Sequence, residues 1–119
     1  MTVPDSAPID WSRLASLKQY DSDGSLVRGA IEAFLADAPG RLAAILNQRQ
    51  AGDSAAMGAA AHALKGAALN VGARVLADAC GAIEARARAG TAATGIAVMT
   101  EGLEATLDEV MRVLVEFMK

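Results

Sequence analysis

Apolar residues recur at helical spacing in one segment after another, and only short breaks, several of them containing glycine, separate these segments. The clearest stripe has intervals of four and three residues and consists of Met57, Ala61, Leu64, Ala68 and Val71. Residues at these intervals share one face of an α-helix. The pattern therefore predicts an amphipathic helix over about residues 54–71, with Asp53 as its cap and Gly72 at its end.

Similar stripes predict five further helices, over about residues 10–19, 25–37, 38–51, 73–89 and 94–118. The break within residues 25–51 is expected at Pro39, since proline removes a helical hydrogen bond and favours the first turn of a new helix. Asp10 is expected to cap the first, short helix. With Trp11 on its apolar edge, that helix would cover the open end of the others.

Very short connections force consecutive helices to turn back on one another. We therefore predict an all-α fold, an antiparallel up-and-down four-helix bundle with a short N-terminal capping helix and an additional helix before Pro39. The 119-residue chain has 53% hydrophobic but only 3% aromatic residues, which argues against an all-β domain. One domain over residues 9–119 is expected, after a flexible leader over residues 1–8 that contains Pro4 and Pro8.

Charge and cysteine content exclude several classes of function. A net charge of −3 gives no basic footprint for nucleic acid. No apolar run is long enough to span a membrane, and no signal peptide opens the chain, so a cytoplasmic protein is expected. The lone Cys80 cannot form an internal disulfide or a cysteine-based zinc cluster, and is expected to be a small core residue. A bundle of this size can be stable as a monomer.

His62 is the only histidine in the chain, and helical geometry places it away from the core. At about 100° per residue, its side chain points about 140° from the stripe on its helix. It therefore faces solvent, with Lys65 three positions further along the helix. Gly58 and Gly66 each cost the helix roughly 1 kcal/mol relative to alanine, which suggests that something must approach the backbone closely on either side of His62.

The surroundings of His62 leave few kinds of chemistry. Metal binding needs further histidine or cysteine ligands, which are missing, so no metal and no cofactor are expected in this chain. A triad-type site needs an oriented base, and His62 has no obvious orienting carboxylate on its own helix. No nucleotide-binding loop is present. The imidazole can still act as a nucleophile itself, because its ordinary pKa near 6.5 leaves a neutral ring available at neutral pH.

The stretch Ala61–Gly72 closely resembles the signature of histidine-containing phosphotransfer (HPt) domains, in which the histidine is followed by an apolar residue, Lys-Gly and small residues. The resemblance extends over nearly the whole chain. Phe34–Pro39 is similar to the family's segment before its proline, and Gly52-Asp53 to its turn before the histidine helix. Cys80 and the segment Ile83–Gly90 match the close of the following helix.

The resemblance implies a phosphorelay intermediate of two-component signal transduction rather than an enzyme. His62 would be the phosphoacceptor, taking a phosphoryl group from the aspartyl phosphate of a receiver domain and passing it to the aspartate of another receiver. Lys65 would help to neutralise the phosphoryl oxygens, and Gly66 would give the partner access. Mg²⁺ is expected on the partner receiver, not on this chain.

Two alternatives stay open. The chain could be the phosphoacceptor domain of a chemotaxis-type histidine kinase, which takes its phosphate from an ATP-binding domain. It could also be a helical adaptor that binds receivers without accepting phosphate. Arg86 and Arg88 are interpreted as charges that complement the helix dipole, with phosphate stabilisation as a less favoured role for Arg88.

Overall fold

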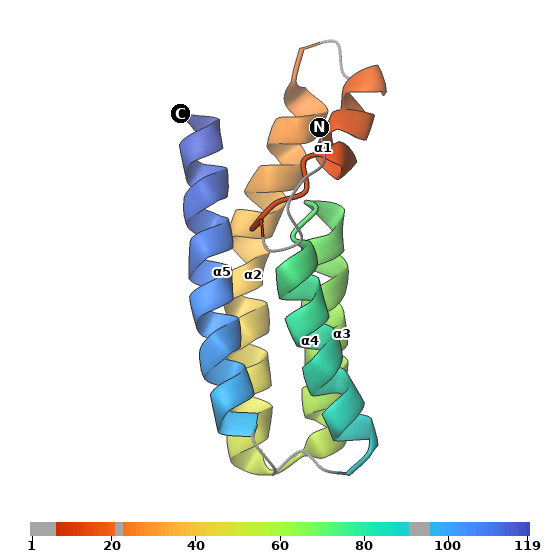
Figure 1. Ribbon diagram of the computed structural model, residues 1–119, viewed down its shortest axis with the longest axis vertical. Helices are drawn as coiled ribbons and strands as arrows, with labels where there is room; N and C mark the ends of the chain where they lie inside the picture. The colour runs from red at the N-terminus through yellow and green to blue at the C-terminus, as the bar shows by residue number, and fades with distance from the viewer. Residues whose placement is uncertain (1–6, 21–22, 91–95) are drawn as a thin grey trace.

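The computed structural model describes residues 7–20, 23–90 and 96–119, and within these ranges it contains helices and no strand. A short helix α1 (Ser12–Leu17) and a 3₁₀ turn η1 (Lys18–Tyr20) precede four long helices. These are α2 (Ser25–Ala51), α3 (Ser54–Asn70), α4 (Arg74–Arg88) and α5 (Ile96–Met118). They alternate in direction along the long axis (Figure 1). The predicted all-α, antiparallel up-and-down bundle is therefore confirmed.

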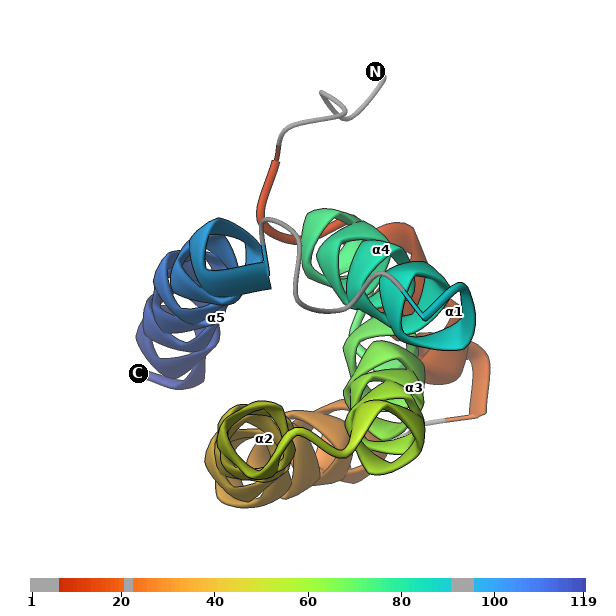
Figure 2. The ribbon, with the colours of Figure 1, turned by 90° about the horizontal axis from the view of Figure 1, so that it is seen from below.

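Each long helix packs against two others, and the apolar stripes meet between them. Viewed along the axis, the helices follow the order α2, α3, α4, α5, with α5 returning to α2 (Figure 2). All five core residues predicted for the histidine helix are buried, four of them on α3 and Val71 at its C-terminal cap. Leu76, Cys80 and Ile83 of α4 are also buried, as are the predicted positions of α5 from Ile96 to Leu114. The predicted position Phe117 is half exposed instead.

The prediction of two helices separated at Pro39 is wrong, because α2 runs without a break from Ser25 to Ala51 and contains Pro39. Ile31, Ala38 and Ile45 lie seven residues apart and are all fully buried. One continuous stripe therefore packs against the other helices on both sides of the proline, and the Pro39 ring itself is exposed. Packing of this stripe outweighs the roughly 3 kcal/mol that proline costs within a helix.

The N-terminal segment covers one end of the bundle, as predicted. Ile9 and Leu14 are buried, and the Trp11 ring lies 5.0 Å from that of Phe117 at the end of α5. Trp11, not Asp10, occupies the cap position of α1, but the Asp10 carboxylate still accepts a 3.0 Å hydrogen bond from the Ser12 N–H. Hydrogen bonds from Ser12, and then from Arg74, hold the pKa of Asp10 below its usual value.

Gly72 joins this segment to the end of α3. It has a positive φ of 78°, and a Cβ at this position would lie 2.1 Å from the Asp10 carbonyl oxygen. The Asp10 N–H donates to the Gly72 carbonyl at 2.7 Å. Gly72 therefore ends α3, as predicted, and also leaves space for the N-terminal segment.

Some predictions concern residues that the structure does not describe. The leader over residues 1–8 lies outside the described residues except for Ala7 and Pro8. Thr94, the predicted start of the last helix, also lies outside them, as does part of the turn at residues 21–24.

Candidate functional site

His62 stands on the outer face of α3, about midway along the helix. Its side chain is 68% exposed, whereas its neighbour Ala61 is fully buried, so the predicted solvent-facing orientation is confirmed. The imidazole borders two grooves. One lies between α3 and α4 and has a volume of about 680 Å³; the other lies between α2 and α3 and has a volume of about 480 Å³. A partner could approach the ring from either groove.

A carboxylate from α4 orients the imidazole. The Glu84 Oε2 atom lies 2.9 Å from His62 Nδ1, and Glu84 is only 6% exposed. An ionised carboxylate only accepts hydrogen bonds, so Nδ1 must carry the proton of the neutral imidazole. The lone pair is then on Nε2. The contact with Glu84 thus favours the tautomer in which Nε2 has the free lone pair.

Arg88 binds the same carboxylate oxygen. Its Nη2 atom donates to Glu84 Oε2 at 2.8 Å, across one turn of α4, and the Arg88 side chain is 75% exposed. A buried carboxylate needs charged or hydrogen-bonding partners to offset its lost hydration. His62 and Arg88 supply them together, which explains how Glu84 can lie in the seam between α3 and α4.

Glu84 is the site residue that the sequence analysis missed. The helix that carries His62 has no acidic residue, and Glu84 is on the next helix. A signal was present, because Glu84 follows Cys80 by four residues and therefore lies on the apolar stripe of α4. An acidic residue at a core-facing position needs a partner.

Lys65 and Arg88 lie on opposite sides of His62 along the bundle axis. The Lys65 side chain is half-buried, and its Nζ atom is 3.7 Å from the position that a Cβ of Gly81 would occupy. Gly81 precedes Glu84 by about one turn of α4, and Arg88 follows Glu84 by one turn. The two cations thus flank the imidazole from opposite directions. Among the described residues, no hydrogen bond or ion pair holds the Lys65 ammonium.

The two glycines next to His62 have different surroundings. A Cβ on Gly58 would lie 3.1 Å from the Ala87 Cβ, so this glycine lets α4 approach α3. A Cβ on Gly66 would meet nothing within 4 Å, and Gly66 is exposed. The expected close approach is therefore seen at Gly58, and at Gly66 it stays a prediction. At Gly58 the approaching element is α4 itself, whereas Gly66 leaves open surface beside His62.

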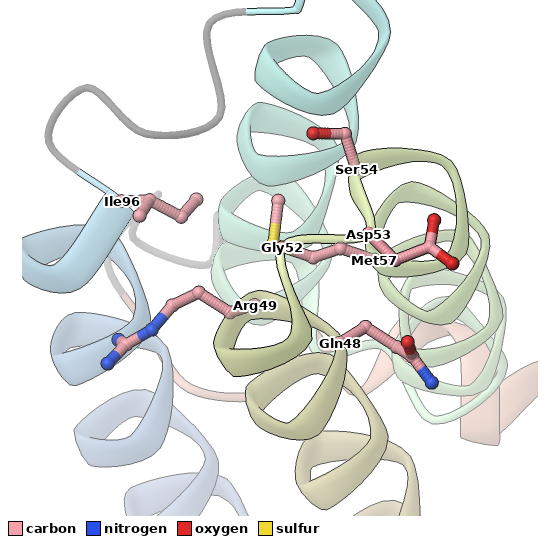
Figure 3. Close-up of a pocket in the computed structure, with 7 residues that line it drawn as sticks. All are labelled: Gln48, Arg49, Gly52, Asp53, Ser54, Met57 and Ile96. Carbon is pink, nitrogen blue, oxygen red and sulfur yellow. The ribbon is translucent and has the colours of Figure 1, made fainter.

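A further cavity, of about 150 Å³, lies at the turn between α2 and α3 (Figure 3). Its two charged side chains already have partners. Arg49 reaches across to α5, where it donates to the Thr100 hydroxyl, and Asp53 caps α3 by accepting from the Ala56 N–H at 3.0 Å. These contacts hold the bundle together, and we assign this cavity no chemistry.

Within the described part of the chain, no three histidine, cysteine or acidic residues are grouped so that they could hold a metal ion. In the same part of the chain, no helix is both long and apolar enough to cross a membrane. Cys80 is buried, and this burial raises the pKa of its thiol to about 12, although the nearby Lys65 acts to lower it.

Comparison with known proteins identifies the family. The model of the Hpt domain family matches residues 29–113. The crystal structure of histidine-containing phosphotransfer protein B (HptB) from Pseudomonas aeruginosa PAO1 is similar, with a TM-score of 0.84 and 29% sequence identity over 93% of this chain and 94% of that chain. A comparison with curated proteins finds no match. The chain therefore belongs to the Hpt domain family, the histidine phosphotransfer intermediates of phosphorelay signalling.

Proposed function

We propose that His62 is the phosphoacceptor of this carrier, and that its Nε2 atom takes a phosphoryl group from the aspartyl phosphate of a receiver domain. One observation supports this most strongly. The only histidine of the chain is exposed, while its Nδ1 atom is bonded to the buried Glu84. The free nitrogen is therefore the one that a partner can reach.

The transfer needs no proton movement within this chain. In the forward step, the Nε2 lone pair forms a bond to phosphorus, and the bond between phosphorus and the aspartyl oxygen breaks, which regenerates a carboxylate on the donor. The Nδ1 proton stays in place, so the ring becomes a cation, which the Glu84 carboxylate stabilises. In the second step, an aspartate oxygen of another receiver attacks phosphorus, and the neutral imidazole leaves. Both directions use the same tautomer.

Lys65 and Gly66 have supporting roles in this proposal. The ammonium of Lys65 is on the same helix, one turn from His62, and can turn towards phosphoryl oxygens without first breaking an ion pair to a described residue. The open surface at Gly66 gives the loops of a receiver room beside the imidazole. Mg²⁺ belongs to the receiver, because phosphoryl transfer depends on positioning and charge neutralisation that the two partners share.

We also propose that the protein acts as a monomer in the cytoplasm. One copy of the chain supplies every residue of the site, and His62 is 68% exposed in that single copy. No second copy is therefore needed to complete it.

Phosphotransfer from labelled receiver domains to the wild-type protein and to His62→Gln tests the proposal. Label should appear on the wild type, be labile in acid and stable in base, and be absent from the variant. Label on His62→Gln would refute the proposal. Binding without label on either protein would favour an adaptor, and label that comes only from an ATP-dependent kinase domain would replace the receiver as donor.

A further inference from the structure

One oxygen atom at the site serves two donors. Glu84 Oε2 lies 2.9 Å from His62 Nδ1 and 2.8 Å from Arg88 Nη2. All three side chains line the groove between α3 and α4. With a neutral imidazole, which is the form that can accept the phosphoryl group, the arrangement is balanced, because the carboxylate has one full positive charge beside it.

Phosphorylation at Nε2 upsets this balance. The ring then carries a positive charge of its own, so two cations compete for one carboxylate oxygen and repel each other. A phosphoryl group with negative oxygens appears a few bonds away at the same time. Opposite charges at such short range attract strongly, and guanidinium is well suited to bind a phosphoryl group with two hydrogen bonds.

We propose that Arg88 moves from Glu84 to the phosphoryl group when His62 is phosphorylated, so that Arg88 and Lys65 hold the group from opposite sides. This inference rests on the proposed function of His62. It makes Arg88 a phosphoryl-binding residue and gives the carrier two charge arrangements, one for each phosphorylation state.

The structure permits this movement without leaving a charge unpaired. When Arg88 leaves, Glu84 keeps the ring cation as its partner, so the buried carboxylate is compensated in both states. The Arg88 side chain is 75% exposed and belongs to the last residue of α4. The groove beside it is lined by the small residues Ala55, Gly58, Ala59 and Ala87, which do not obstruct a long side chain.

The test uses phosphoramidate, which delivers a phosphoryl group to histidine with ammonia as the leaving group and needs no receiver. Four proteins are compared by NMR: wild type, Arg88→Ala, Arg88→Lys and Arg112→Ala. Arg112 is the matched control, because it is an exposed arginine on α5 that lines neither groove beside His62. The readouts are the side-chain N–H signal of Arg88 and the ³¹P titration of the phosphoryl group.

In the wild type, the Arg88 signal should shift on phosphorylation. The phosphoryl group of Arg88→Ala should bind a proton about three- to tenfold more tightly than that of the wild type, because a neighbouring cation disfavours protonation. Arg88→Lys should lie between them, and Arg112→Ala should match the wild type.

An Arg88 signal that does not respond to phosphorylation, with the same ³¹P titration in Arg88→Ala and the wild type, would overturn the inference. Phosphohistidine formed under those conditions would leave the proposed function intact. A wild-type protein that forms no phosphohistidine would overturn both.

Discussion

His62 has an α4 flank and an α2 flank, the sides of the imidazole that face these two helices, and they differ in how much of the site exists before a partner binds. On the α4 flank, Gly58 packs against Ala87 and Glu84 is already bonded to the imidazole. On the α2 flank, the groove is wide and Gly66 faces open space. Contacts within the bundle thus orient the imidazole, whereas open surface gives a partner access to it. Glycine at four positions before and after the histidine has a different purpose on each flank.

The largest effect is expected when the α4 flank loses its carboxylate. In Glu84→Ala, Nδ1 no longer has an acceptor and the ring cation no longer has a partner. A hydrogen bond to a charged group is worth about 1.5–3 kcal/mol, so phosphotransfer should slow by roughly 10- to 100-fold. Stopped-flow transfer from a phosphorylated receiver measures this.

The matched variant for that experiment is Glu84→Gln, which keeps a carbonyl acceptor for Nδ1 but no charge. It should fall between Glu84→Ala and the wild type. Equal rates in all three proteins would show that Glu84 neither orients the ring nor stabilises its charge.

Gly58→Leu should damage the fold. The first added carbon already meets Ala87 at 3.1 Å, and the Cβ of Ala87 cannot move without moving α4. Overpacking of this kind costs about 1–3 kcal/mol, even though leucine is the better helix former. Urea denaturation would give the change in the free energy of unfolding, and a variant as stable as the wild type would contradict the close packing of α3 on α4.

Gly66→Leu is the counterpart on the open flank, and it should separate access from stability. The free energy of unfolding should rise by about 0.5–1 kcal/mol, since leucine replaces glycine in a helix and meets nothing. Transfer from a receiver should slow, whereas phosphorylation by phosphoramidate should not. If both donors are slowed equally, Gly66 acts on His62 itself and not on partner access.

A smaller effect concerns the core beneath the α4 flank. Cys80 lies one turn from Glu84 but is fully buried, and burial raises the pKa of its thiol to about 12. The folded protein should therefore resist alkylation at pH 8, and unfolding in urea should expose the thiol. The folded thiol holds its proton more tightly than the unfolded thiol, whose pKa is 9.0. Its contribution to the free energy of unfolding is therefore fully present below pH 9.0 and is lost as the pH rises towards 12. Rapid labelling of the native protein would contradict the burial.

The helices and the exposed position of His62 could be predicted because both depend on local periodicity. The stripe from Met57 to Val71 defines a face, and the position of His62 relative to it follows from helical geometry. Glu84 could not be found in this way. Its contact with His62 depends on how α4 lies against α3, and the register between two helices is set by packing across the whole interface.

The predicted break at Pro39 is wrong for the opposite reason, because it gives a single residue's helix-breaking tendency more weight than the apolar stripe around it. Proline disfavours a helix interior, but the seven-residue spacing of Ile31, Ala38 and Ile45 continues across it. The continuous stripe was present in the sequence and carried more information than the single proline. Packing of a whole face outweighs the loss of one hydrogen bond.

The central claim is that Glu84 holds the proton on Nδ1 and so makes Nε2 the phosphoacceptor. Long-range ¹H–¹⁵N NMR on the free and phosphorylated protein tests it directly, and a single histidine leaves no ambiguity of assignment. We expect a protonated Nδ1 in both states, with phosphorus coupled to Nε2 after transfer. Phosphorus coupled to Nδ1 would contradict the claim.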